Sequence, residues 1–305
     1  MKLLITGAWQ GAQEHIPEIE RMGHEVVFMQ WEKDELPCPP DEIEGVICNG
    51  LFMNHDIEKF TSLKYIQLTS AGLDRVPLDY IKSHNIELHN ARGVYSIPMA
   101  EFAIGGVLNL YKQSRFFMKN QQARKWEKNR CLMELFGKTV CIVGCGSVGT
   151  ECAKRFKAFG CEVIGVDIAP RTDISFDRID ALSELDRILP TADILVLTVP
   201  LTNETRYLIN KERISLMKPS AVLVNIARGA VVETSALTEA LQENKLGGAV
   251  LDVFEDEPLS DNSPLWDIEN VVVSAHCSFV GEKNGDRLSF LIIDRLRSSK
   301  NVSFC

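Results

Sequence analysis

The sequence lacks most of the features that mark membrane, secreted or nucleic-acid-binding proteins. None of its apolar runs approaches the roughly 20 residues that a membrane-spanning helix needs. Residues 1–10 do not have the cleavage pattern of a signal peptide. The net charge is −9, and no basic run with interleaved aromatic residues occurs, which argues against nucleic-acid binding. We therefore expect no membrane and no nucleic-acid partner.

Cysteine pairs at the spacing of metal sites are also lacking. The chain has nine cysteines, but no two are separated by the two residues of a Cys-x-x-Cys motif. The odd, scattered set suits a reducing compartment, so we predict a cytoplasmic protein without a metal site. Five cysteines fall in expected strands or helices and are interpreted as small core residues. They are Cys48, Cys141, Cys145, Cys152 and Cys161.

The length of 305 residues exceeds one typical core, so two domains are expected. Short apolar runs alternate with helices or loops, which is typical of parallel sheets with covered faces. We expect strands of a first α/β domain at residues 1–6, 25–29, 45–48, 63–68 and 86–89. Six strands of a second, doubly wound domain are expected at 140–143, 162–166, 194–199, 221–226, 248–253 and 271–274. Helices are expected at residues 96–112 and 287–297, and segment 117–136 is interpreted as a connection that wraps the surface between the domains.

A glycine loop follows the first strand of the second domain. Gly144, Gly146 and Gly149 stand between that strand and a helical pattern ending at Gly160. Glycines at this spacing allow backbone amides at a helix N-terminus to approach a pyrophosphate. The next strand ends on Asp167, 18 residues after Gly149, where an acid hydrogen-bonds an adenosine ribose. The stretch predicts a dinucleotide site; the alternative is an ordinary strand-to-helix turn.

Three charged or titratable residues follow later strands of the same sheet. Arg228 follows strand 221–226, the acids 255–257 follow strand 248–253, and His276 follows strand 271–274. In a doubly wound sheet the carboxyl ends of the strands face the ligand, so these side chains share one edge with the glycine loop. Taken singly, each has a structural alternative: a surface ion pair, a solvated acidic turn, or a structural histidine.

Together these residues suit hydride transfer from a nicotinamide to a 2-oxo acid. The carbonyl oxygen gathers negative charge and needs a proton donor, and His276 titrates near neutral pH. Glu257 would favour the protonated imidazole by its charge and by a hydrogen bond. The planar guanidinium of Arg228 can hold the substrate carboxylate and polarise the carbonyl.

The motifs resemble those of the NAD-dependent D-isomer specific 2-hydroxyacid dehydrogenase family. The resemblance covers nearly the whole chain and is carried by residues 143–149, 197–202, 225–232, 251–259 and 270–276. It implies that Arg228, Glu257 and His276 are the catalytic residues, with His276 as acid/base. It also implies a flavodoxin-like substrate domain (residues 1–93 and 280–305) and a Rossmann NAD-binding domain (residues 94–279).

The cofactor site is implied by the same resemblance. Asp252 matches an aspartate that contacts the nicotinamide carboxamide. Asp167 favours NAD over NADP because it would repel a 2′-phosphate, although nearby Arg171 leaves some use of NADP open. The implied cofactor-binding residues are Ser96, Gly144, Gly146, Ser147, Val148, Gly149, Asp167, Val199, Pro200, Ala227, Arg228, Asp252 and His276.

The resemblance implies that substrate binds between the two domains, whose closure would exclude water. Backbone amides of Ser70, Ala71 and Gly72 would hold its carboxylate, together with Arg228 and His276. The loop at residues 49–54, expected to face the substrate side chain, is apolar, which favours a small or apolar 2-oxo acid. Arg75 and Lys64 keep a phosphorylated substrate open. The family also implies a homodimer formed through the NAD-binding domain.

Other functions fit the same fold. An NAD(H)-sensing protein, like the corepressors that share it, would keep the same three catalytic residues. Phosphoglycerate or phosphite dehydrogenase is a further alternative, whereas formate enzymes place glutamine where Glu257 stands. Two positions depart from the family: Ala275 replaces a common proline, and bulky Phe279 stands where small residues predominate.

Overall fold

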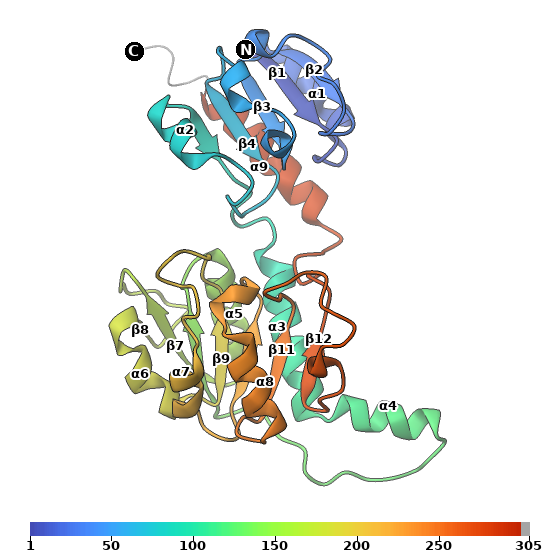
Figure 1. Cartoon of the computed structure of the whole chain (residues 1–305), viewed down its shortest axis with the longest axis vertical. Helices are drawn as coiled ribbons and strands as arrows, with labels where there is room; N and C mark the ends of the chain where they lie inside the picture. Colours follow the sequence, from blue (N-terminus) through green and yellow to red (C-terminus); the bar gives the residue numbers. More distant parts are fainter. Residues whose placement is uncertain (300–305) are drawn as a thin grey trace. The chain divides into compact units, whose positions relative to one another are not determined.

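The computed structural model describes residues 1–299 and divides into two compact units. The first unit comprises Met1–Tyr95 and the segment that starts at Gly281; the second is Ser96–Val280. Each contains one parallel sheet with helices on its faces (Figure 1), so the predicted fold class is confirmed. Within residues 1–299, no helix is long and apolar enough to cross a membrane.

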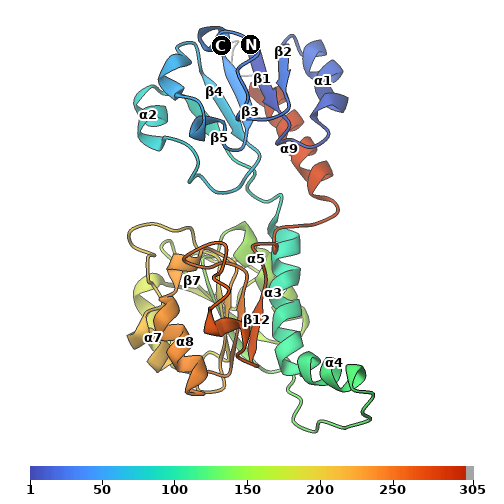
Figure 2. The ribbon, with the colours of Figure 1, turned by 45° about the vertical axis from the view of Figure 1, so that its right-hand side comes forward.

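The first unit holds a five-stranded sheet with the order β2-β1-β3-β4-β5. This order is that of flavodoxin-like folds. The helices α1 and α9 contact each other (Figure 2), and residues of both pack with alternate residues of β1, such as Leu3 and Ile5. Leu4, between them, belongs to the cluster on the other face, as the two-residue period of a strand requires. The elements are β1 (Lys2–Thr6), α1 (Ala12–Arg21), β2 (Glu25–Met29), β3 (Gly45–Cys48), β4 (Tyr65–Leu68), α2 (Leu78–Ser83), β5 (Glu87–His89) and α9 (Asn284–Ser299).

The second unit holds a seven-stranded parallel sheet with the order β12-β11-β10-β9-β6-β7-β8. The prediction of six strands was wrong because it missed β8, an edge strand that reads Arg-Ile-Asp-Ala and buries only Ile179. The strands are β6 (Thr139–Val143), β7 (Glu162–Asp167), β8 (Arg178–Ala181), β9 (Ile194–Leu197), β10 (Val222–Asn225), β11 (Gly248–Leu251) and β12 (Val271–Val273). The helices are α3 (Ser96–Tyr111), α4 (Ser114–Gln122), α5 (Ser147–Ala158), α6 (Leu185–Ile188), α7 (Lys211–Leu216) and α8 (Thr234–Gln242).

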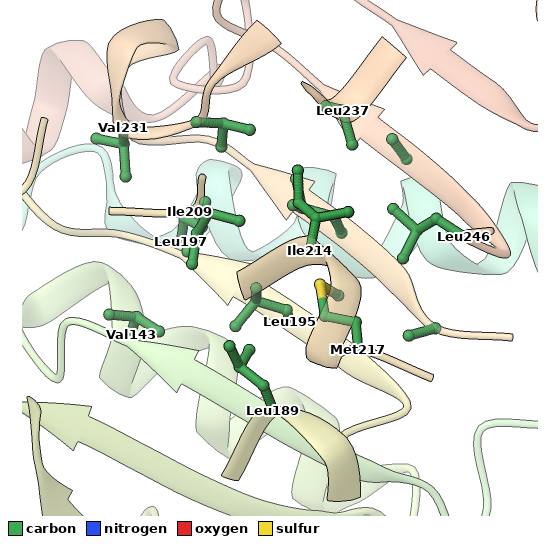
Figure 3. Close-up of a cluster of buried hydrophobic side chains, with 14 of the residues drawn as sticks. Val143, Leu189, Leu195, Leu197, Ile209, Ile214, Met217, Val231, Leu237 and Leu246 are labelled. Atoms are coloured by element: carbon green, nitrogen blue, oxygen red, sulfur yellow. The ribbon is translucent and has the colours of Figure 1, made fainter. Parts of the chain in front are cut away.

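Both faces of this sheet are buried, which explains why its strands are apolar throughout. Val140 and Ile142 pack with residues of α3 and α5 on one face. Val143, Leu195 and Leu197 pack on the other face with residues of α6, α7 and α8 (Figure 3). The sheet is therefore a rigid support, and the loops at the carboxyl ends of its strands inherit fixed positions.

The segment after α3, which was expected to be a surface connection, begins with a helix. The helix α4 occupies its first part and extends away from the sheet of the second unit (Figures 1 and 2). The Arg115 guanidinium donates to the Ile268 carbonyl at 3.1 Å, and Lys119 pairs with Glu269, which fixes the base of α4. Trp126, beyond the helix, is 98% exposed. We refer to residues 114–136 as the α4 arm.

Candidate active site

The glycine loop between β6 and α5 has the close packing that only glycine allows. Gly144 has a φ of +96°, and a Cβ there would lie 2.9 Å from Cγ1 of Val199. A Cβ on Gly149 would lie 2.0 Å from the carbonyl oxygen of Gly144. Helix α5 starts at Ser147, and its N-cap residue Gly146 provides no side-chain cap. The amides of the first turn, including those of Ser147 and Val148, are therefore free of side-chain capping and suited to a pyrophosphate.

Thr198 also shapes this loop, a role that was not predicted from the sequence. Its hydroxyl lies 2.6 Å from the Gly144 carbonyl oxygen and 3.1 Å from that of Val143, so its single proton is shared between them. Thr198 directly follows the apolar strand β9, and a hydroxyl residue at the carboxyl end of a strand could have been predicted to have a role there. Thr198 thus ties the end of β9 to the glycine loop.

Asp167 is the last residue of β7 and its carboxylate faces the glycine loop. Its Oδ2 accepts the Cys145 amide at 2.7 Å, and its Oδ1 accepts the Ala169 amide at 3.2 Å. Nη1 of Arg171 lies 3.9 Å from Oδ2, and Nη2 of Arg171 donates to the Cys145 carbonyl. A cation therefore stands beside the acid that was predicted to select NAD.

The cysteines near the loop are packing residues, as predicted. Cys141 and Cys145 are fully buried, and so is Cys152 on α5. Burial raises the pKa of each of these three thiols to about 12, so they stay protonated at neutral pH. Cys48 and Cys161 are buried as well, which confirms the interpretation of all five as core residues.

Ser96 is the first residue of α3 and is only 3% exposed. Its hydroxyl has no hydrogen-bond partner among the residues that the structure describes. A buried hydroxyl without a protein partner is unfavourable unless a ligand or water satisfies it, so it fits a cofactor contact. Val199 and Pro200 follow β9, and Ala227 follows β10, so these predicted cofactor residues share the edge of the glycine loop.

Arg228 is held in a turn that buried Asn225 organises at the end of β10. The Asn225 side chain accepts the Ala227 amide at 3.1 Å and donates to the Arg228 carbonyl at 3.0 Å. A Cβ on Gly229 would lie 1.9 Å from the backbone carbon of Phe254, so this turn packs directly on the segment that carries Glu257. The role of Asn225 was not predicted. The sequence feature that indicates it is a polar residue at the end of an apolar strand.

Glu257 and His276 form a hydrogen-bonded pair. Oε2 of Glu257 lies 2.8 Å from Nδ1 of His276, and Oε1 accepts the Phe254 amide at 3.0 Å. A carboxylate only accepts, so Nδ1 carries a proton. Nε2 has no partner within residues 1–299, and His276 has a φ of +52°, a conformation that a non-glycine residue keeps only when its surroundings hold it. The imidazole thus has one nitrogen fixed and the other available.

The loop that carries His276 is built around Asp252, which is fully buried. The Asp252 carboxylate accepts the Ser274 hydroxyl at 2.5 Å and the amides of Cys277 and Ser278 at 2.7 and 2.9 Å. Its backbone carbonyl accepts the His276 amide at 2.8 Å. Asp252 therefore holds His276 in its left-handed conformation, and its contact with nicotinamide stays a prediction.

Glu255, two residues before Glu257, has hydrogen-bond partners of its own. Glu255 accepts the Tyr207 hydroxyl at 2.6 Å and the Thr234 amide at 2.8 Å, so it secures the start of α8. Burial raises the pKa of Glu255, but these hydrogen bonds outweigh the burial, so the pKa is lowered.

Phe279 lies edge-on to the His276 ring, with ring centroids 6.1 Å apart, and is 42% exposed. Phe279 therefore adds an apolar surface beside the imidazole.

In the first unit, Ser70, Ala71 and Gly72 follow β4. The Ser70 carbonyl accepts the Ala91 amide at 2.8 Å, and the Ala71 carbonyl accepts the Asn90 side chain at 2.7 Å. Within residues 1–299, no amide of residues 70–72 has a hydrogen-bond partner. Fixed carbonyls and free amides fit the predicted role in holding a carboxylate.

Comparisons with known proteins identify the family. Residues 104–278 match the family model "D-isomer specific 2-hydroxyacid dehydrogenase, NAD binding domain". The chain belongs to this family. The prediction of an NAD-dependent dehydrogenase of this class is confirmed at the family level, as are the oxidoreductase class and the Rossmann NAD-binding fold.

Relatives with known names span several activities. D-3-phosphoglycerate dehydrogenase of Methanocaldococcus jannaschii is 33% identical over 90% of this chain, which spans only 53% of that enzyme's length. Hydroxypyruvate reductase of Thermotoga maritima is 34% identical over 89% of this chain and 90% of its own. A solved family structure from Xanthobacter autotrophicus, in complex with NADPH and MES, has a TM-score of 0.78 at 25% identity and covers 98% and 95% of the two chains.

Proposed function

We propose that this protein reduces a small or apolar 2-oxo acid to the D-2-hydroxy acid with NADH. The observation that carries the proposal is the Glu257–His276 pair at 2.8 Å, which leaves Nε2 of His276 available. Bound nicotinamide supplies the hydride. His276 donates a proton from Nε2 to the carbonyl oxygen, and Glu257 stabilises the protonated ring.

The chain's other residues bind and orient the reactants. Arg228 would pair with the substrate carboxylate and polarise the carbonyl. The free amides of Ala71 and Gly72 in the first unit would hold the same carboxylate. The glycine loop, Ser96 and Asp167 would hold the cofactor, whose pyrophosphate suits the first turn of α5.

A substrate panel tests the proposal. Purified protein should oxidise NADH with at least one of glyoxylate, 2-oxobutanoate and hydroxypyruvate, and more efficiently than with phosphohydroxypyruvate. The product from 2-oxobutanoate or hydroxypyruvate should be the D-alcohol, whereas glycolate, the product from glyoxylate, is achiral. The same panel with NADPH measures cofactor preference. NADH binding with no turnover across the panel would contradict the enzyme proposal and favour an NAD(H) sensor.

Asp167 is expected to set the preference for NADH, with Arg171 limiting it. Asp167→Asn should raise KM for NADH about 10- to 100-fold, the value of a hydrogen bond to a charged group, and should bring NADPH to comparable efficiency. Steady-state kinetics with both cofactors measures the change. Asp186→Asn is the matched control, because Asp186 is an exposed acid of the same unit that pairs with Arg213 at 2.7 Å and with no residue of the glycine loop among residues 1–299. An unchanged NADH/NADPH ratio in Asp167→Asn would contradict the assignment.

We propose a homodimer through the second unit, with the α4 arm as its contact. The arm carries exposed apolar side chains that a second copy could cover: Phe117, Met118, Trp126, Leu132 and Phe136. Trp126→Glu should therefore shift the protein toward monomer in light scattering. Trp31→Glu, at an exposed tryptophan of the first unit, is the control. A monomeric wild-type protein would overturn this part of the proposal.

A cytoplasmic location is part of the proposal. The eight cysteines among residues 1–299 are all free thiols, and five of them are buried in the two cores. Free thiols in this number suit a reducing compartment.

A further inference from the structure

The strand order of the first sheet indicates at which end of its strands, and between which of them, a ligand would bind. With the order β2-β1-β3-β4-β5, the chain leaves β1 toward β2 on one side and reaches β3 on the other. Ligands of such sheets bind at this switch point, beyond the carboxyl ends of the two central strands. Here that point lies between the end of β1 at Thr6 and the loop after β3, which begins at Asn49.

A carboxylate of the chain itself occupies the donors at the switch point. Oε1 of Glu32 accepts the Thr6 hydroxyl at 2.8 Å and the Asn49 amide at 2.6 Å. Oε2 of Glu32 accepts the Gly50 amide at 2.7 Å. Two successive amides and a hydroxyl are the donor set with which a loop binds an anionic ligand group.

Glu32 also holds the far end of the same loop. Its backbone carbonyl lies 2.9 Å from Nε2 of His55, which must donate because a carbonyl only accepts. Between these two attachments, Leu51 is fully buried and Phe52 packs edge-on against Phe60. Glu32 therefore fixes the loop at residues 49–55 from both ends.

The loop presents one exposed apolar side chain at this edge. Met53 is 69% exposed, and its sulfur lies 3.5 Å from the position that a Cβ on Gly50 would take. Oε2 of Glu32 lies 3.5 Å from that same position, and Cδ of Arg75 lies 3.8 Å from it. Lys64 pairs instead with Glu44 at 3.1 Å, before β4, at the opposite edge of the sheet.

We propose that Glu32 is a positioning residue: it fixes the loop that was expected to face the substrate side chain, and its charge restricts that side chain to an uncharged one. The proposal rests on the 2-oxo acid reductase function proposed above. An anionic substituent would meet amides that are already engaged and a fixed negative charge, whereas an apolar substituent would meet Met53. Glyoxylate has no side chain, so it should not sense this loop.

The test compares glyoxylate, 2-oxobutanoate and phosphohydroxypyruvate in the wild-type protein and in Glu32→Gln. The wild type should use 2-oxobutanoate at least ten times more efficiently than phosphohydroxypyruvate. Glu32→Gln places an amide NH₂ against a backbone donor and removes the charge, so KM for 2-oxobutanoate should rise about ten-fold. Its kcat with glyoxylate should change less than about two-fold, and discrimination against phosphohydroxypyruvate should shrink.

Glu44→Gln is the matched control, because Glu44 accepts the Lys2 amide at 3.0 Å but lies at the opposite edge of the same sheet. Met53→Ala leaves every Glu32 hydrogen bond in place and should raise KM for 2-oxobutanoate about three-fold, with glyoxylate unaffected. This second variant keeps the test decisive if Glu32→Gln fails to fold.

Four outcomes would overturn the proposal. The first three are an equal loss in Glu32→Gln for glyoxylate and 2-oxobutanoate, an unchanged KM for 2-oxobutanoate in Met53→Ala, and a wild-type preference for phosphohydroxypyruvate. The first would make Glu32 merely structural, and the third would point to Arg75 as the recognising group. The fourth, no turnover of any 2-oxo acid by the wild type, is the distinct result that also overturns the proposed function.

Discussion

Replacing His276 by glutamine is expected to lower kcat for the 2-oxo acid about 10²- to 10⁴-fold, the usual contribution of a positioned acid/base. Glutamine keeps a polar side chain of similar reach but cannot carry a proton to the carbonyl oxygen. NADH binding should persist, because the glycine loop and Asp167 lie on other strands. Stopped-flow or steady-state assays give the rate, and fluorescence titration gives the NADH affinity.

The control for His276 is His84→Gln, which changes an exposed histidine stacked on Tyr80 in the first unit. Its kcat should match that of the wild type. Near-normal turnover in His276→Gln would remove His276 from the mechanism. A large loss of NADH affinity in that variant would instead mean that it disturbs the cofactor site.

Replacing Arg228 by alanine is expected to lower kcat/KM about 10³-fold, through both a higher KM for the 2-oxo acid and a lower kcat. A guanidinium paired with a carboxylate makes two charge-assisted hydrogen bonds, and one group that stabilises a developing oxyanion contributes about 10²–10³ in rate. Arg228→Lys keeps the charge but loses the planar fork, so it should recover only about a tenth of the lost efficiency. Saturation curves at fixed NADH separate KM from kcat.

The control for Arg228 is Arg187→Ala, at an exposed arginine of the same unit that pairs with Glu184 at 2.7 Å. It should leave both constants unchanged. If Arg228→Lys were as active as the wild type, the planar, bidentate contact proposed for Arg228 would be wrong.

The glycine loop could be predicted because its evidence is local. The stretch from β6 to Asp167 contains, in order, a strand, three glycines, the helix α5 and the acid. Each of these parts has residues that favour its own backbone conformation. The apolar strands were equally readable, since both faces of the sheet are buried. Strand β8 was missed because an edge strand buries one face only weakly and reads as polar.

Predicting the candidate catalytic residues needed the topology of the sheet as well as the sequence pattern. That Arg228, the acids and His276 share one edge follows from parallel strands, a rule that sequence alone can apply. Glu257 was predicted as the partner of His276, although Glu255 and Glu257 are chemically alike. The structure separates them: Glu255 turns to Tyr207 and Thr234, and Glu257 turns to His276.

By itself, the sequence determined the two parallel sheets, the glycine loop and the sheet edge that carries Arg228, Glu257 and His276. Only the tertiary structure decided how Asp252 fixes His276 and how Glu32 fixes the loop after β3. The reason is physical. A strand or a glycine turn depends on neighbours in the chain, whereas one carboxylate that joins Thr6, Asn49 and Gly50 depends on strands that meet only in the folded sheet.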